Sequence, residues 1–334
     1  MSSATETYWG IWLHAVRPVA ELAALAATAE SLGAAAVLVA DEGTDRDLFV
    51  TLAAVAQATR RVLLIGAVTN PHTRHPVASA AAFASLAELA PGRVVAGYGA
   101  GGSRVLAPLG IRPPQPYTAL AECLDIVQAL FRGDTVTHTG LFCVDGVRLP
   151  WVPAHLPIAV AGRGPRVERL AAQRADYVLL AGRSVESIPA VVARLRSSGR
   201  PQGPPRIVCN PVAAWTPAMR EELRAHLAYM AVDMPAAERA LLRLDGERTA
   251  ELRRIVNSRG PEAAARLIGD SVLDEYAIVG DRPAVVKRLG VLLEQVRPEI
   301  LAFDLGQYSN DFVQTVAALA LDAGASIFHN AETA

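Results

Sequence analysis

The sequence has almost no lysine, few cysteines and few aromatic residues. Lys287 is the single lysine, so arginine supplies nearly all of the 32 basic residues, and 33 acidic residues bring the formal net charge to −1. Such a balance lacks the basic surface that a general binder of nucleic acid or of membranes requires. The three cysteines are odd in number and far apart, which fits a reducing compartment better than a disulfide framework.

Long apolar runs are also absent, although the mean hydropathy is +0.25. A spanning helix needs about 20 consecutive apolar residues, and the best runs here, 34–40 and 315–321, are far shorter. The first ten residues show no basic segment followed by an apolar one, which is the pattern of a secretion signal. We therefore expect no membrane segment, no nucleic-acid partner and a cytoplasmic protein.

Short apolar runs alternate with longer amphipathic segments along the chain. Apolar runs bounded by turn residues are typical of strands buried on both faces of a parallel sheet, and the amphipathic segments are typical of helices covering that sheet. Eight such units predict an α/β fold, a (β/α)8 TIM barrel that fills residues 1–334 as a single domain. The expected strands are 8–13, 35–40, 62–68, 93–99, 157–162, 176–182, 206–215 and 299–305.

Two segments depart from this alternation. Residues 139–149 predict an inserted hairpin with the pair Asp145-Gly146 at its tight turn. Residues from about 217 to 269 are polar and helical in pattern, and they predict a helical insertion after the seventh strand of the barrel.

In a TIM barrel the chemistry lies at the carboxyl ends of the strands. The second expected strand ends at Asp41 and Glu42. A carboxylate at such a place can act as a general acid or base where its pKa is raised. A structural role for Glu42 is an equal alternative, and Asp45 or Asp47 is expected to cap the following helix.

Two motifs match known ligand-binding patterns, but we do not favour those interpretations here. His72 and His75 form an H-x-x-H, but they lie in a proline-flanked loop without the spacing of a zinc-binding helix, so we expect no metal there. The sequence GYGAGG at 97–102 satisfies G-x-G-x-x-G. The acidic residue that should follow a dinucleotide-binding motif would be Glu122, inside a helix, so a closely packed turn beneath a ligand is the better interpretation.

The sequence AGRGPR at 161–166 combines a strand end, glycines, arginines and the start of a helix. Free N–H groups at a helix N-terminus beside a guanidinium group form an anion site, particularly for phosphate. Arg183, at the end of the next strand, could reach the same anion. A plain glycine turn with solvated arginines is the alternative.

The runs ADEGTDRD at 40–47, V-T-N-P-x-T-R-x-P at 68–76 and AELAPGRVVAGYGAGG at 87–102 are more specific. Together they resemble the luciferase-like monooxygenase superfamily, and within it the branch that uses the deazaflavin coenzyme F420, typified by methylene-tetrahydromethanopterin reductase. The resemblance is strongest over 35–142 and fades across 212–274.

This resemblance implies a barrel that holds a flavin-like ring at its mouth, backed by a bulge with a non-prolyl cis peptide bond in the third strand. The bulge falls on Gly66, Ala67 and Val68, with Ala67-Val68 the expected cis bond. Asp41 would orient the ring or its loop. The coenzyme phosphate would lie near Ala161, Gly162, Arg163 and Gly164, with Arg183 as its counter-charge.

Three positions depart from the family pattern. The reductases carry Glu where this chain has Trp12, Asp where it has Gly102, and often His where it has Glu42. All three positions lie near the reacting ring in the family. We therefore expect this chain to share the fold and the coenzyme of the family more closely than its substrate.

The expected activity is hydride transfer between coenzyme F420 and a small organic substrate, such as a pterin or an activated double bond. Glu42 is the first candidate for the proton donor or acceptor, followed by His14 and His72. The alternatives are a monooxygenase dependent on flavin mononucleotide (FMN), and a non-catalytic binding barrel whose mouth is filled by side chains such as Trp12. The family also implies a homodimer, paired through helices near the second and third strands.

Overall fold

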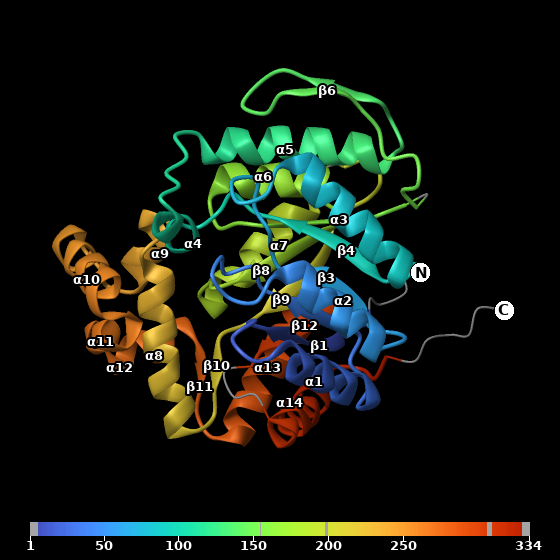
Figure 1. The fold of residues 1–334 in the computed structure, drawn as a ribbon. Coiled ribbons are helices and arrows are strands. Elements are labelled where there is room, and N and C mark those ends of the chain that lie inside the picture. Colours follow the sequence, from blue (N-terminus) through green and yellow to red (C-terminus); the bar gives the residue numbers. More distant parts are fainter. Residues whose placement is uncertain (1–5, 154, 198–199, 306–308, 329–334) are drawn as a thin grey trace.

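The computed structural model describes residues 6–153, 155–197, 200–305 and 309–328. Its centre is a closed barrel of parallel strands in the order β1-β12-β9-β8-β7-β4-β3-β2, which confirms the predicted TIM barrel (Figure 1). The barrel strands are β1 (Tyr8–Leu13), β2 (Ala36–Val39), β3 (Leu63–Gly66), β4 (Val94–Tyr98), β7 (Ile158–Ala161), β8 (Tyr177–Ala181), β9 (Arg206–Asn210) and β12 (Ile300–Asp304).

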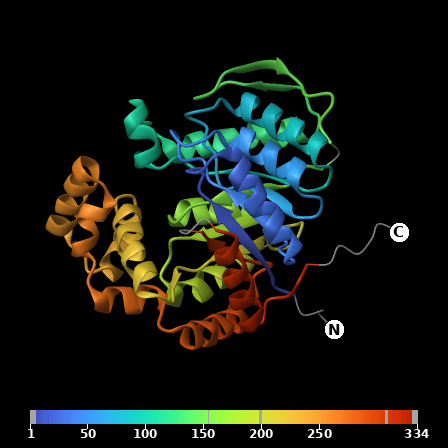
Figure 2. The same ribbon diagram turned by 60° about the horizontal axis from the view of Figure 1, so that its bottom comes forward.

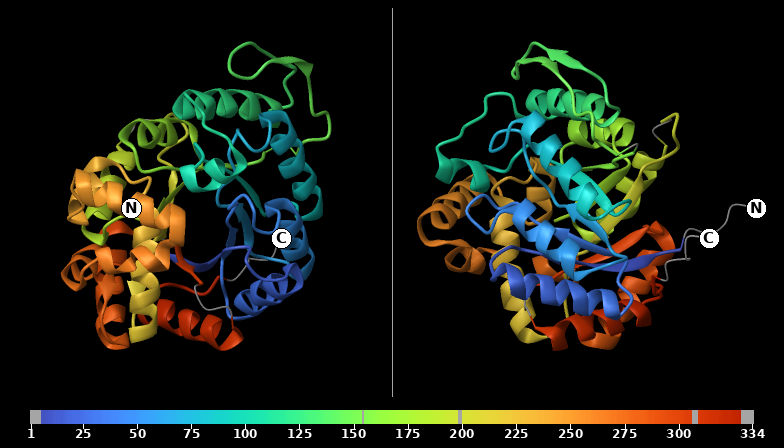
Figure 3. Two further views of the ribbon diagram at one scale, coloured as in Figure 1. Left: turned by 60° about the vertical axis from the view of Figure 1, so that its left-hand side comes forward. Right: turned by 45° about the vertical axis from the view of Figure 1, so that its right-hand side comes forward.

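Helices surround these strands on the outside of the barrel (Figure 3). Several begin at a proline, which needs no N–H partner in the first turn, and Asp47 caps α2 by accepting from the amides of Phe49 and Val50, as predicted. The outer helices are α1 (Val19–Ser31), α2 (Leu48–Ala58), α3 (Pro76–Leu89), α5 (Pro116–Phe131), α6 (Pro165–Arg174), α7 (Ile188–Arg196), α13 (Arg282–Val296) and α14 (Asn310–Asp322). Within the described residues, no helix combines the length and the apolarity that a membrane crossing requires.

The hairpin between α5 and β7 exists, but its turn lies elsewhere than predicted. Its strands are β5 (Val136–His138) and β6 (Val144–Val147), so Asp145-Gly146 lies inside β6. The chain reverses over 139–143 instead, where the Glu122 carboxylate accepts hydrogen bonds from the amides of Leu141 and Phe142. A carboxylate supplied by α5 stabilises this turn, and a local turn signal does not reveal it.

The predicted insertion follows β9, the seventh barrel strand along the chain. The chain leaves the barrel through β10 (Ala213–Ala214) and returns through β11 (Ile278–Val279), and these two strands pair in parallel. Between them lie α8 (Pro217–Ala231), α9 (Ala236–Leu241), α10 (Gly246–Arg259), α11 (Pro261–Ala264) and α12 (Asp270–Tyr276). The insertion therefore ends beyond 269, because α12 packs Leu273 and Tyr276 into an apolar cluster with Leu227 and Leu252. Figure 2 shows this helical unit beside the barrel.

The third strand contains the expected irregularity. The peptide bond between Ala67 and Val68 is cis, as predicted. Beyond it, Thr69 resumes pairing with β4, because its amide donates to Gly97 O (3.0 Å) and its carbonyl accepts from the Gly99 amide (2.8 Å). The β3–β4 edge of the barrel mouth thus continues past Gly66.

Gly97 makes the closest backbone approach in this region. A Cβ built on Gly97 would overlap the carbonyl oxygen of Gly66. This agrees with the interpretation of GYGAGG as a closely packed barrel turn, since the first glycine serves contact between strands.

We expect Gly97→Ala to destabilise the protein by more than about 3 kcal/mol, because neither backbone can move without breaking the β3–β4 pairing. Thermal and denaturant unfolding measure the change. Gly269→Ala is the matched control: a Cβ there meets nothing within 4 Å and its φ is −74°. Equal stability of the two variants would contradict the packing argument.

Candidate functional site

A cavity of about 910 Å³ lies at the carboxyl end of the barrel. Its wall includes residues that follow β1, β2, β9 and β12 on the barrel side, and residues of α8 and α11 on the side of the insertion. This is the end of a TIM barrel at which active sites occur. Trp12 is not among the lining residues; it packs in the barrel interior with Leu38 and Ile65, so it does not fill the cavity.

His14 and Asp304 form an ion pair on the cavity wall. His14 Nε2 lies 2.9 Å from Asp304 Oδ2. Burial alone would lower the pKa of His14, but the charge and hydrogen bond of Asp304, helped by the charges of Glu42 and Asp45, outweigh burial and raise it to about 9. Burial opposes ionisation of Asp304, yet the charge and hydrogen bond of His14 hold its pKa below the ordinary value. His14 is therefore an imidazolium at neutral pH.

His226, on α8, faces the same pair but remains neutral. Burial lowers its pKa, and the positive charge of His14 lowers it further, while Asp304 and Glu42 only partly oppose them. The cavity thus holds one charged and one neutral imidazole, a pair whose pKa values are pushed apart by their surroundings.

Glu42 contacts the insertion directly. Tyr229 Oη, on α8, donates a hydrogen bond to Glu42 Oε2 at 2.6 Å. Burial and the charge of Glu42 raise the pKa of Tyr229, so it stays a phenol and keeps donating. The guanidinium group of Arg104 lies over the Tyr229 ring, with Cζ 3.7 Å from the ring centroid. All three side chains line the cavity, and they join the loops after β2 and β4 to the insertion.

We expect Asp304→Asn to lower the pKa of His14, because burial is then opposed only by the weaker effects of Glu42 and Asp45. The folded-state pKa of about 9 exceeds the unfolded value of about 6.5. The pair's stabilisation is therefore complete below about pH 6.5 and is lost as pH rises through 9, and at the acid end it is lost as Asp304 becomes protonated.

The variant should accordingly be less stable by about 1–2 kcal/mol near pH 6 and match the parent above about pH 10. NMR titration of His14 and melting curves across pH measure both effects. Asp145→Asn, on the exposed hairpin, is the control. A destabilisation that does not change with pH would contradict this account.

Asp41 and the alanines beside it form the floor of the barrel mouth. Thr69 Oγ1 donates to Asp41 Oδ2 at 2.7 Å, which ties the end of β2 to the segment that follows the cis bond. Burial raises the pKa of Asp41, and the Thr69 hydrogen bond only partly opposes it. Small side chains end four barrel strands here: Ala40, Ala67, Ala161 and Ala181. Such a floor leaves room for a flat ring above it.

His72 is not brought to the cavity. It does not line the wall with His14 and Glu42, and its Cδ2 packs 3.2 Å from the place of a Cβ at Gly101. Burial lowers its pKa. His75 has a capping role, since its Nδ1 accepts from the Val77 amide at the start of α3. His72 therefore lies apart from the other two candidates for the proton donor, Glu42 and His14.

The residues of the predicted anion site lie directly after β7. α6 begins at Pro165, with Gly164 at the N-cap and no side-chain cap. Beside it, Arg163 Nη1 is buried without a hydrogen-bond partner among the described residues, while Nη2 reaches the carbonyl of Met230 at 3.4 Å. A Cβ at Gly164 would meet nothing within 4 Å. An unpaired guanidinium nitrogen beside an uncapped helix start is suited to an anion.

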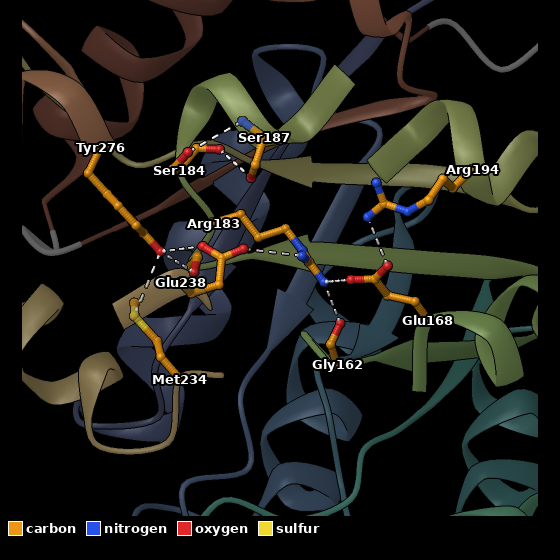
Figure 4. Close-up of polar contacts among 10 residues, drawn as sticks. Gly162, Glu168, Arg183, Ser184, Ser187, Arg194, Met234, Glu238 and Tyr276 are labelled. Atoms are coloured by element: carbon orange, nitrogen blue, oxygen red, sulfur yellow. Dashed lines mark hydrogen bonds and ion pairs between the residues drawn. The ribbon is translucent and has the colours of Figure 1, made fainter. Parts of the chain in front are cut away.

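Arg183 lies nearby, but its charge is already balanced (Figure 4). Only 3% of its side chain is exposed, and Nη2 lies 2.8 Å from Glu168 Oε1 and 2.9 Å from the Gly162 carbonyl, while Nη1 lies 3.5 Å from Glu238 Oε1. We therefore correct the expected role: Arg183 holds the Gly162 turn in place, and Arg163 is the side chain left to meet an anion.

Several site residues escaped the sequence interpretation. Tyr229, His226 and Asp304 lie far along the chain from their partners Glu42 and His14. Asp233, just past α8, accepts hydrogen bonds from Ser103 N (2.7 Å) and Oγ (2.6 Å). Asp233 Oδ2 also lies 3.3 Å from the place of a Cβ at Gly102, so the insertion supplies a carboxylate where the sequence lacks one.

Known proteins resemble this chain in sequence and in fold. The sequence model of the luciferase-like monooxygenase family matches residues 3–297. A 5,10-methylenetetrahydromethanopterin reductase from Methanolobus tindarius is 28% identical over 187 residues, 56% of this chain and 57% of that protein. An F420-dependent glucose-6-phosphate dehydrogenase from Beutenbergia cavernae is 38% identical over 142 residues, 40% of this chain and 42% of that protein. The match thus spans about half of each relative's length.

A solved structure has the same fold over nearly its whole length. It is the coenzyme F420-dependent tetrahydromethanopterin reductase from Methanopyrus kandleri, with a TM-score of 0.79 and 19% identity. The match covers 93% of this chain and 97% of that one.

Proposed function

This chain belongs to the luciferase-like monooxygenase family, and from that premise we propose that it is an oxidoreductase dependent on coenzyme F420. It transfers hydride between the coenzyme and a small organic substrate. The observation that carries the proposal is the arrangement of the barrel mouth. It combines a cluster of small side chains at the strand ends, a guanidinium nitrogen of Arg163 without a partner among the described residues, and a cavity lined by Glu42, His14 and Asp304. Relatives whose names specify F420 support the choice of coenzyme.

The residues present fit this coenzyme. The alanine floor and the Asp41–Thr69 pair would carry the flat ring, and Arg163 with the start of α6 would hold the phosphate of its tail. Arg163 Nη1 lacks a partner among the described residues, which the phosphate would supply. A bound deazaflavin supplies a hydride donor or acceptor, and it lacks the oxygen chemistry of a flavin.

The protein's own groups then have distinct tasks. Glu42 holds or accepts the proton that accompanies hydride transfer, with Tyr229 fixing its carboxylate. His14, charged through Asp304, stabilises negative charge that develops on the substrate. Helix α8 covers this side of the mouth and so excludes water from the reacting atoms.

Titration with each coenzyme tests the proposal. We expect quenching of F420 fluorescence with a low-micromolar or tighter dissociation constant, and oxidation of reduced F420 when 2-cyclohexen-1-one is added as an acceptor probe. Tight binding of FMN without binding of F420, together with oxygen consumption by reduced FMN, would overturn the proposal in favour of a monooxygenase. Binding of either coenzyme without turnover of any acceptor would favour a binding protein.

We also propose that the protein is a cytoplasmic homodimer paired through α2 and α3. Val50 on α2 and Leu89 on α3 are large apolar side chains that are 59% and 50% exposed, as expected of a face that a second copy covers. Sedimentation analysis should give twice the monomer mass, and a monomer at micromolar concentration would exclude this pairing.

A further inference from the structure

The wall of the cavity carries more negative than positive charge. Its cationic side chains are His14 and Arg104. The carboxylates on it are Glu42, Asp45, Glu221, Glu222, Glu262 and Asp304.

Two of these six carboxylates are held in ion pairs, and the charge of His14 also acts on Glu42 and Asp45. Asp304 is paired with His14, and Glu221 lies 3.1 Å from Nε of Arg224. Within the part of the chain that the structure describes, no ion pair holds the remaining four, Glu42, Asp45, Glu222 and Glu262. Carboxylates left facing one concave space repel one another and concentrate a negative potential within it.

An aromatic wall lies in the same cavity. Trp215 and Phe312, both half-buried and both lining it, stack with ring centroids 5.8 Å apart and planes 5° apart. Met219 lines the cavity as well. Aromatic faces attract cations and pack against apolar groups, so this wall suits an organic cation better than a small hydrated ion.

Positive charge on this wall is outnumbered, since His14 and Arg104 face six carboxylates. Arg104 lies over the Tyr229 ring, and its buried Nη1 has no hydrogen-bond partner among the described residues. Arg163, whose Nη1 is in the same state, does not line this cavity. The two ligands of the proposed reaction therefore meet surfaces of opposite sign: the anionic tail of the coenzyme at Arg163, and the substrate among carboxylates.

We propose that this cavity binds an organic cation, an ammonium group carried on an apolar body, as the substrate. The inference rests on the proposed function, because it assigns the substrate of that same site. It also separates this chain from its Beutenbergia relative, which is named for glucose 6-phosphate, since this wall repels a sugar phosphate.

A matched pair of probes tests the sign of the charge. 3-Phenylpropylammonium and 3-phenylpropionate share a ring and a chain and differ in charge, and calorimetry measures both, at 20 and 200 mM NaCl, in protein with and without F420. We expect the cation to bind about tenfold tighter at low salt, with a smaller preference at high salt. Equal binding of the two probes, or tighter binding of the anion, would overturn the inference.

Variants locate the effect on the wall. Glu222→Gln combined with Glu262→Gln should reduce the preference to less than about threefold. Glu247→Gln combined with Glu251→Gln, on α10 and outside the cavity lining, removes the same charge and should leave the preference unchanged. An unchanged preference in the first double variant would overturn the assignment to this cavity.

The two proposals fail in different ways. Absence of F420 binding would overturn the proposed function while the cation preference of the protein without coenzyme could still be measured. Loss of the preference in protein that binds F420 would overturn only the substrate class.

Discussion

Replacing Glu42 by Gln is expected to lower hydride transfer by a factor of about 10² to 10⁴ while F420 binding stays within about threefold of the parent. General acid–base catalysis contributes gains of that size, and an amide can neither give nor take the proton. Gln keeps the shape of the side chain and can still accept the hydrogen bond from Tyr229 Oη. The loss should therefore fall on turnover and not on the fold. Oxidation of reduced F420 by 2-cyclohexen-1-one, followed in a single turnover, measures it.

Tyr229→Phe is the companion variant. It removes the hydrogen bond to Glu42 but leaves the carboxylate in the cavity, so we expect a loss of about tenfold, between the parent and Glu42→Gln. The control is Glu186→Gln, since Glu186 lies outside the cavity lining. A Glu42→Gln protein that turns over like the parent would remove Glu42 from the mechanism and leave His14 as the candidate.

The elements of the barrel could be predicted because their signals are local. A strand buried on both faces is a continuous apolar run, and the helix starts have prolines or capping side chains beside them. The bounds of β1 come out as predicted for that reason. The position of the hairpin turn was not predicted correctly, because Glu122, the residue that stabilises the turn, lies on another element.

The site residues also differ in whether a local signal predicts them. Residues that end a single strand, such as Asp41, Glu42 and Arg163, follow from the strand positions alone. The partner of Glu42 is 187 positions away, and nothing local in α8 predicts that it crosses the barrel mouth at Tyr229.

The pairing of His14 with Asp304 is an intermediate case. Closing any eight-stranded barrel brings its first and last strands together, and here Trp12 is in register with Asp304. Two residues beyond Trp12, the His14 side chain can reach that carboxylate. Barrel closure was therefore a usable signal in the sequence, and applying it to polar residues at the ends of β1 and β12 would have found the pair.

Arg163→Met is expected to weaken binding of F420 by about 30- to 100-fold, which corresponds to about 2–3 kcal/mol for a charged hydrogen bond to phosphate. Arg163 is half-buried, and burial lowers the pKa of its guanidinium group. Its Nη1 has no partner among the described residues, so an anion would satisfy a group that is already desolvated. Methionine keeps an unbranched side chain and removes the charge and the donors, including the hydrogen bond from Nη2 to the Met230 carbonyl.

A coenzyme fragment separates this role from a general loss of structure. The deazaflavin without its phosphate-bearing tail should bind the parent and Arg163→Met equally, because it never reaches the anion site. Arg166→Met serves as the control: Arg166 is exposed and lies over the Tyr117 ring, and its loss should change F420 affinity by less than about threefold. An Arg163→Met protein that loses affinity for the fragment as much as for the whole coenzyme would place Arg163 in the architecture of the mouth. Phosphate binding would then fall to the α6 amides alone, since Glu168 and Glu238 already hold the charge of Arg183.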